Sequence, residues 1–372
     1  MLSLEFLQIY WWCVVSLLGG LLVFMMFVQG GQTLLFGLCK NELQKDMVIN
    51  SIGRKWELTF TTLVMFGGAC FAAFPLFYAT SFGGAYWVWL AILFCFILQA
   101  VSYEYRKKPD NFLGQKTYEI FLFINGSLGV ILIGMAVSTF FSGSDFLLNE
   151  HNFVQWQTPF RGLEALGNIM LYPLGIAVFF LSRVGGALYL INNIDDEEIR
   201  ANARKAVLKN TILFLPFFLA FAAWVLSKPG FGYDEAGEVS VVAFKYVRNF
   251  ADMPIIAVAA VAGVCGVLFG VFKGAFTKSI YGIVPFGAGV VLVVTALFLI
   301  SGLNGTAFYP SFSDLQSSLT IKNASSSRYT LNVMFYVSFL VPVVLGYIVA
   351  VWRAMDSKKI TADEIKRDHH AY

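Results

Sequence analysis

The sequence predicts an all-α polytopic membrane protein with nine transmembrane helices. Of its 372 residues, 58% are hydrophobic and only 13% are charged, whereas roughly a quarter of the residues are charged in ordinary soluble domains. This composition leaves too little polar surface to cover a soluble domain of this length. Soluble enzymes and disordered chains are therefore excluded. The net charge of +3 also gives no argument for a nucleic-acid partner.

Nine stretches are long and apolar enough to cross a bilayer, which takes about 20 helical residues. They are continuously apolar and do not alternate in polarity, so they predict helices and not the strands of a barrel. The third stretch is short and rich in aromatic residues. The predicted spans cover residues 9–29, 57–79, 86–103, 119–141, 165–190, 208–227, 253–272, 280–303 and 332–352.

The distribution of lysine and arginine predicts the orientation of these spans. The connections after the odd-numbered spans hold 19 basic residues, and those after the even-numbered spans hold 6. Because cytoplasmic loops are enriched in Lys and Arg, the N-terminus is expected in the periplasm and the C-terminus in the cytoplasm. The chain is then a nine-helix domain, residues 1–352, with a cytoplasmic tail, residues 353–372. The first apolar stretch is expected to be retained as a span and not cleaved as a signal peptide.

A faint internal repeat relates the first two spans to the fifth and sixth. In both places a glycine pair precedes a polar stretch with Asn and acidic residues, and a basic residue opens the next helix. The repeat predicts two four-helix bundles plus one additional helix, with halves at about 1–141 and 165–303. A chance likeness of two polar inner loops also stays open. The connection 191–207 has acidic residues first and basic residues last, which predicts a short cytoplasmic helix.

Residues that ligate metals or act as nucleophiles are scarce. No predicted span contains a histidine, so this chain by itself cannot hold a haem between two histidines in the membrane. His151 lies in an outer loop, and His369 and His370 are expected in a solvated tail and not in a metal site. The five cysteines have no CxxC spacing, and there is no nucleophile elbow or phosphate-binding loop. The prediction is therefore no metal site and no catalytic residue in this chain.

Ionisable residues at membrane depth are costly, so they are the remaining functional signal. Arg183 lies deep in the fifth span, where its guanidinium is expected to face a carboxylate or another subunit. Glu57 follows Trp56 at the start of the second span and has two interpretations. It is either a first-turn carboxylate stabilised by the helix N-terminus or a protonatable relay at a cytoplasmic entrance. These residues alone favour the first interpretation.

Four other polar residues predict helix contacts. Gln29 and Gln32 are three residues apart and share one face of the first helix, where packing against another helix is favoured over a polar track. Glu104 and Glu119 lie near the cytoplasmic ends of the third and fourth spans. Both are expected to form interfacial salt bridges.

Three stretches resemble subunit II of the bacterial cytochrome bd quinol oxidases. The first, residues 49–82, contains the Trp56-Glu57 pair and the segment AAFP. The second is YEYRKK after the third span. The third, residues 309–352, contains SLTI, ASSS and TLNVM and is the most specific. The chain length and the number of spans also fit, so the resemblance covers the whole chain.

The resemblance implies a partner of similar fold, subunit I, which ligates two b-type haems and one d-type haem and oxidises quinol in the bacterial inner membrane. It also implies that Glu57, supported by Trp56, lies on a proton route from the cytoplasm, which reverses the preference stated above. The family often has Asp at this position, so the carboxylate here is one methylene longer. Where the family's first helix often reads D-G-F-D, this chain reads QGGQ from Gln29 to Gln32, so no charged role is expected there.

Three functions follow as alternatives. The leading one is a haem-free subunit that supports subunit I and conducts protons; the others are a multi-pass secondary transporter and a pure assembly scaffold. Transporters often have helices broken by proline, but Arg183 is the only deep charge available for ion coupling. A quinone or lipid bound to this chain and a small single-span subunit also stay open. The prolines within predicted spans are Pro173, Pro216, Pro285 and Pro342.

Overall fold

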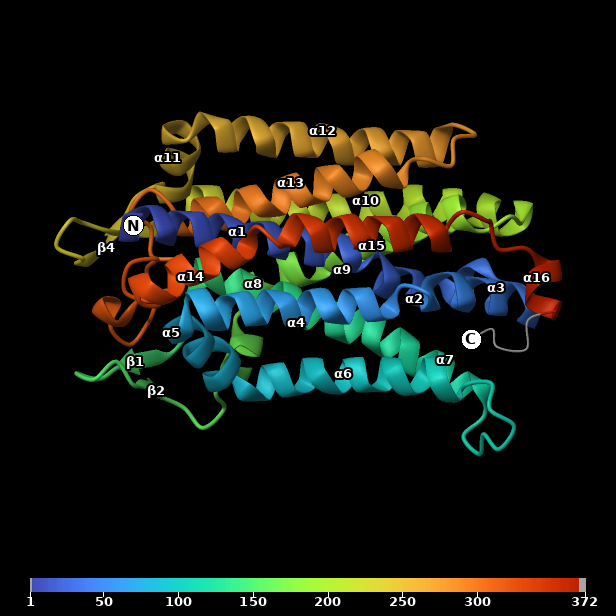
Figure 1. Ribbon diagram of the computed structural model, residues 1–372, viewed down its shortest axis with the longest axis horizontal. Helices are drawn as coiled ribbons and strands as arrows, with labels where there is room; N and C mark the ends of the chain where they lie inside the picture. Colours follow the sequence, from blue (N-terminus) through green and yellow to red (C-terminus); the bar gives the residue numbers. More distant parts are fainter. Residues whose placement is uncertain (1, 368–372) are drawn as a thin grey trace.

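The computed structural model describes residues 2–367 as a bundle of long helices that run roughly parallel to the longest axis (Figure 1). Within these residues, eight helical stretches are long and apolar enough to cross a membrane. A ninth is present if one bent helix pair counts as a single span. Each of the nine predicted spans coincides with one of these stretches, so the all-α polytopic fold is confirmed.

The first two spans and the last are each built from two helices. The first comprises α1 (Leu4–Met25) and α2 (Phe27–Leu38), and the second comprises α3 (Glu42–Gly53) and α4 (Trp56–Ala73). The last, α14 (Arg328–Ser338) and α15 (Val341–Met355), is bent by 42°. The other spans are α6 (Tyr86–Tyr105), α7 (Gln115–Ile124) continued by η2 (Asn125–Gly129) and α8 (Val130–Ser142), α9 (Tyr172–Asn193), α10 (Glu197–Ser227), α12 (Pro254–Phe276) and α13 (Ile283–Gly302).

Proline sets several helix boundaries. The second span was expected to reach residue 79, but α4 ends at Ala73. The next residue, Phe74, precedes Pro75, and the helical conformation is sterically disfavoured for a residue before proline. The chain continues through the short α5 (Pro75–Tyr78) and the π-helical turn η1 (Ala79–Gly84). Pro342 lies in the first turn of α15, where a missing N–H is tolerated, and it accompanies the bend.

The connection 191–207 does not form a separate short helix, so that prediction is wrong. Asp196 caps the start of α10 by accepting a hydrogen bond from the Ile199 N–H. From there α10 runs without a break for 31 residues. No glycine or proline interrupts the chain before Pro216, so the boundary between polar and apolar sequence is not a helix boundary.

Four spans from the first part of the chain pack against four spans from the second part. The first group is α1–α2, α4, α6 and α7–α8; the second is α9, α10, α12 and α13. They meet where α2 and α8 pack on α9 and where α1 packs on α13. At the first contact a Cβ on Gly30 would lie 1.9 Å from the Ser182 carbonyl oxygen, and one on Gly186 would lie 2.3 Å from the Gly31 nitrogen. A glycine from each pair, Gly31 and Gly186, thus lies at the α2–α9 contact, and the repeat stays a prediction.

The two ends of the molecule differ in structure. The N-terminus lies at the end that carries two antiparallel hairpins, β1 (Phe146–Leu148) with β2 (Val154–Trp156) and β3 (Gly230–Tyr233) with β4 (Val239–Val242), whereas α3 and α16 (Ala362–Arg367) lie at the other end (Figure 1). A chain that crosses the bundle an odd number of times starts at one end and finishes at the other, so the N-terminus and α16 lie at opposite ends. The hairpin end also contains α11 (Lys245–Asp252) and the 3-10 turns η3 (Leu163–Gly167), η4 (Ile169–Leu171) and η5 (Leu315–Ser317).

Candidate functional site

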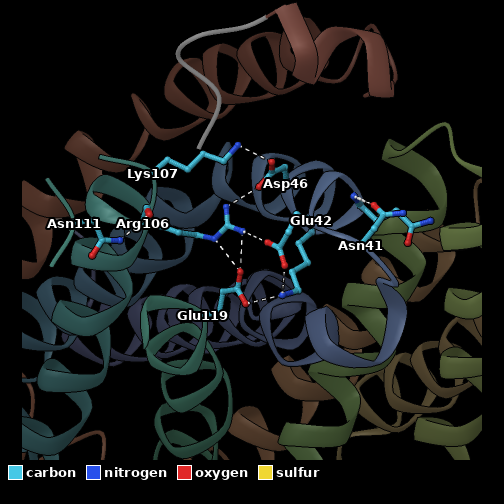
Figure 2. Close-up of polar contacts among 9 residues, drawn as sticks. Asn41, Glu42, Asp46, Arg106, Lys107, Asn111 and Glu119 are labelled. Carbon is cyan, nitrogen blue, oxygen red and sulfur yellow. Dashed lines mark hydrogen bonds and ion pairs between the residues drawn. The ribbon is translucent and has the colours of Figure 1, made fainter. Parts of the chain in front are cut away.

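Arg106 is the centre of a charged network at the end of the bundle that carries α3 (Figure 2). It is only 1% exposed, and its guanidinium donates to Glu119 at 2.8 Å and to Asp46 at 2.7 Å. Glu42 lies 3.6 Å away. Glu119, itself 1% exposed, also accepts from Lys45 at 3.1 Å. The network therefore joins α3, α6 and α7, and a buried charge of each sign is paired.

The loop between α6 and α7 holds Arg106 in place. Arg106 directly follows the last residue of α6, where a cation is favoured by the exposed carbonyls of the helix end. The Asn111 side chain donates to the Arg106 carbonyl at 2.9 Å and accepts from the Gly114 N–H, also at 2.9 Å. Gly114 has φ +78°, which lets the chain turn into α7. Lys107 adds an ion pair to Asp46 at 2.8 Å (Figure 2).

A buried polar seam continues inward from this network between α2 and α6. Gln99 and Tyr103 lie on the same face of α6 as Arg106, at spacings of seven and three residues. Gln29 donates to the Gln99 side-chain oxygen at 3.4 Å, and Gln32 donates to the Tyr103 hydroxyl at 3.0 Å. The predicted glutamine face of the first span thus packs against another helix.

Sequence reasoning missed two members of this seam, Gln99 and Asn125. Both are fully buried amides inside apolar runs, and that position was the available signal. Asn125 opens η2, a π-helical turn of the kind often found at functional sites. Among residues 2–367, the buried side-chain atoms without a hydrogen-bond partner include atoms of Gln29, Gln32, Gln99 and Asn125. The seam is therefore polar but incompletely satisfied.

Trp56 and Glu57 begin α4 and point in different directions. The Trp56 ring stacks on Tyr103, with ring centres 5.9 Å apart and planes 15° apart. Its indole nitrogen is buried and has no partner in the part of the chain that the structure describes. Glu57 is exposed, and within the same residues it forms no ion pair or hydrogen bond. Trp56 is thus joined to the seam, whereas Glu57 faces out of the subunit.

Arg183 does not meet a carboxylate in the described chain. Its Nε donates to the Asn210 side chain at 2.8 Å, and its guanidinium contacts the Thr33 carbonyl at 3.4 Å and the Phe179 ring at 5.4 Å. Neutral oxygens of α2 and α10 accept its N–H groups in place of a carboxylate. A contact with another subunit stays a prediction.

The two glutamates near the ends of α6 and α7 differ in outcome. The salt bridge predicted for Glu119 is confirmed by its pairing with Arg106. Glu104 is exposed and forms no ion pair with residues 2–367, so its predicted salt bridge stays a prediction. It lies on the face of α6 opposite Arg106. Its place at an interface with another subunit stays a prediction.

No metal cluster is formed by the residues that the structure describes. Within residues 2–367, no group of three His, Cys, Asp or Glu side chains is placed so that it could hold an ion. His151 is exposed at the turn between β1 and β2. The predictions for His369 and His370 lie outside the described residues.

Comparison with known proteins gives a consistent result. Residues 7–355 match the family model described as cytochrome bd terminal oxidase subunit II. The chain is 27% identical over 390 residues to the cytochrome bd-I ubiquinol oxidase subunit 2 of Escherichia coli strain K12, covering 100% of both. It is 28% identical over 320 residues to the cytochrome bd ubiquinol oxidase subunit 2 of Bacillus subtilis strain 168, covering 82% of each. A chain of the bd oxidase structure from Geobacillus thermodenitrificans shares the fold, with a TM-score of 0.64, 12% identity and coverage of 95% of this chain and 99% of that one.

Proposed function

Because this chain belongs to the cytochrome bd terminal oxidase subunit II family, we propose that it is the haem-free subunit of the oxidase and carries part of its cytoplasmic proton route. The chain is a multi-span subunit of a quinol:oxygen oxidoreductase, and its partner is a subunit I. The two b-type haems and the d-type haem belong, in this proposal, to that partner. The complex lies in the bacterial inner membrane, with the α3 end of this chain toward the cytoplasm.

The side chains of this subunit do not suit the ligation of haem. Its spans contain no histidine, and His151 is exposed on a hairpin. The buried methionines, Met25, Met26, Met47 and Met135, are 0–7% exposed and belong to the packed interior of the helices. No electron-transfer step is therefore assigned to residues of this chain. Its contributions are to pack against the haem-bearing partner and to hold protonatable groups in place.

The position of Glu57 carries the proton-route proposal. A carboxylate at the cytoplasmic margin can take a proton from water and pass it to a neighbouring acceptor. Along the exposed face of α4, Thr61 is one turn away, but Val64, Gly68 and Phe71 follow, and none of them can accept a proton. The next acceptor must then come from outside this chain. We infer that Glu57 faces subunit I and that the relay continues there.

Trp56 supports this arrangement without taking part in proton transfer. Its ring stacks on Tyr103 of α6, which fixes the first turn of α4 against the buried seam. Glu57 is the next residue, so its backbone position is set by the same contact. The outward direction of Glu57 and the inward direction of Trp56 follow from their adjacent places on one helix.

The test is a comparison of two carboxylates in the complex with subunit I. Glu57→Gln is expected to reduce oxygen consumption with quinol by about 100-fold, the lower end of the range for a lost proton-transfer group. Glu104→Gln removes another exposed carboxylate near the same end and is expected to leave turnover unchanged. A reduced-minus-oxidised spectrum should show equal d-type and b-type haem in both variants, and none in this chain purified alone.

The outcomes separate the alternatives. Full turnover of Glu57→Gln with normal haem content would favour the pure assembly scaffold. Haem bound to this chain alone would contradict the haem-free proposal. Membership of the oxidase family favours the oxidase over a secondary transporter. A quinone or lipid bound to this chain and a small single-span subunit stay predictions.

A further inference from the structure

Asp356, which directly follows α15, accepts hydrogen bonds from four side chains. One carboxylate oxygen accepts from Lys55 Nζ at 3.0 Å, from the Asn193 amide at 3.1 Å and from the Tyr189 hydroxyl at 3.3 Å. The other accepts from the Trp352 indole N–H at 2.6 Å. These donors come from the start of α4, from α9 and from α15. Three segments far apart in the sequence therefore meet at one carboxylate.

Lys55 links this carboxylate to the start of α4. It is the residue that precedes α4, and its carbonyl accepts the Leu58 N–H in the first turn at 3.1 Å. Its side chain is 0% exposed, and its ion-pair partner within the described residues is Asp356. The Trp352 ring lies 5.4 Å from Nζ. A buried ammonium needs its counter-charge, so the pair holds this turn in one place. Glu57 is two residues further on.

The segment after Asp356 crosses the same end of the bundle. The Ile360 N–H donates to the Asn193 carbonyl at 3.0 Å, and the Ile360 carbonyl accepts the Asp195 N–H at 2.9 Å. Glu364 pairs with Arg54 at 2.7 Å, and α16 packs on α3. In contrast, no side chain of α15 is buried within this chain. The α15 half of the last span is therefore attached to the bundle chiefly at its cytoplasmic end, whereas α14 packs on α1 and α4 at the other end.

We propose that Asp356 is a positioning residue that acts through Lys55 to hold the carboxylate of Glu57, which rests on the proton role proposed above for Glu57. Misplacement of a reacting group by about 1 Å can lower a rate by about 100-fold. Through the same ion pair, the packing of α15 in the assembled complex sets the position of the first turn of α4. The C-terminal end of the chain thereby couples assembly with subunit I to the proton route.

A double-mutant cycle in the complex with subunit I tests this positioning role. Asp356→Asn keeps the shape of the side chain and removes its charge, and it is expected to lower the maximal turnover several-fold without a matching rise in the KM for quinol. In a Glu57→Gln background the same change is expected to have no further effect, because the group that it positions is already absent. Glu364→Gln breaks the neighbouring ion pair to Arg54 and is the matched control, with unchanged turnover.

Each outcome of the cycle has one meaning. If Asp356→Asn slows turnover by the same factor in both backgrounds, its effect is structural and the positioning role is wrong. If Glu57→Gln slows turnover but Asp356→Asn does not, the positioning role alone fails. If Glu57→Gln itself has no effect, the proton role of Glu57 fails and the positioning role fails with it.

A charge exchange covers the case in which Asp356→Asn does not assemble. Lys55→Asp and Asp356→Lys are each expected to reduce turnover, and the two together should restore a large part of it, because the ion pair is rebuilt in the opposite sense. The haem spectrum reports assembly in all three proteins. Assembled double variants that turn over no faster than the slower single variant would contradict the role of the ion pair.

Discussion

Two fully buried cations are stabilised by carboxylates from other elements. Arg106 is 1% exposed and Lys55 is 0% exposed. Each pairs with a carboxylate on a different helix or segment. Removal of one partner leaves a charge in a poorly solvated place, and this costs more than the pair itself contributes. These residues are therefore the points at which single substitutions act most strongly.

Glu119→Gln is expected to lower the free energy of unfolding by about 3 kcal/mol. This loss is at the lower end of the range for breaking a buried ion pair, because Asp46 still pairs with Arg106 at 2.7 Å. Glu42→Gln is the control: Glu42 is 66% exposed at the side chain and is expected to cost less than about 1 kcal/mol. Denaturation of the purified complex in mild detergent measures both. Equal losses in the two variants would contradict the assigned importance of burial.

Burial of Lys228, at the hairpin end of the bundle, is expected to make the free energy of unfolding depend on pH. It follows α10, donates to the Phe141 carbonyl, and lies 5.0 Å and 5.2 Å from the Trp224 and Phe231 ring centres. Burial lowers the pKa of Lys228 from 10.5 to about 8. The unfolded chain therefore binds more protons between these two pH values, and the free energy of unfolding rises as pH increases from about 8 to 10.5.

The measurement is the thermal unfolding midpoint of the protein across this pH range, with Lys228→Met as the comparison. The native protein is expected to gain stability relative to Lys228→Met as the pH rises. A constant difference between the two proteins from pH 7 to pH 11 would show that Lys228 titrates alike in the folded and unfolded chains.

At the scale of elements, close approach of α2 and α9 depends on glycine. Gly30→Ala would place a Cβ 1.9 Å from a backbone oxygen of α9, which a shift of a side chain cannot relieve. We expect a loss of about 1–3 kcal/mol, with larger values if the two helices separate. Gly37→Ala lies in the same helix with nothing within 4 Å and should be neutral or stabilising. Thermal unfolding of the two variants gives the comparison, and similar midpoints would contradict the close contact.

The existence of the helices could be predicted from hydropathy, but their ends and internal breaks could not. The length of an apolar stretch can be read from consecutive residues, and it is enough to locate all nine spans. The extension of α10 beyond its apolar part depends on an Asp196 cap and on helix-forming polar residues, which carry no hydropathy signal. The π-helical turns η1 and η2 depend on how neighbouring helices pack, so no local sequence pattern predicts them.

At the scale of the whole molecule, the orientation in the membrane gives a direct prediction. In a cysteine-free protein, His151→Cys on the β1–β2 hairpin should react with an impermeant thiol reagent added to intact cells. Asp110→Cys in the α6–α7 loop should react only after the membrane is made permeable. The two exposed positions lie at opposite ends of the bundle, as the excess of Lys and Arg at one end predicts. The reverse pattern of labelling would invert the proposed direction of the proton route.

The sequence by itself determined the membrane class, the nine spans and the family resemblance, because hydropathy, the absence of membrane histidines and short motifs are written in consecutive residues. The tertiary structure decided which polar groups meet. Arg106 and Glu119 are 13 residues apart and share a buried network with α3, whereas Lys55 and Asp356 are 301 residues apart and form one ion pair. Such pairings depend on the rotation and packing of helices around one another, which the composition of a single helix does not specify. The same dependence turned Glu57 outward and left Arg183 with neutral partners.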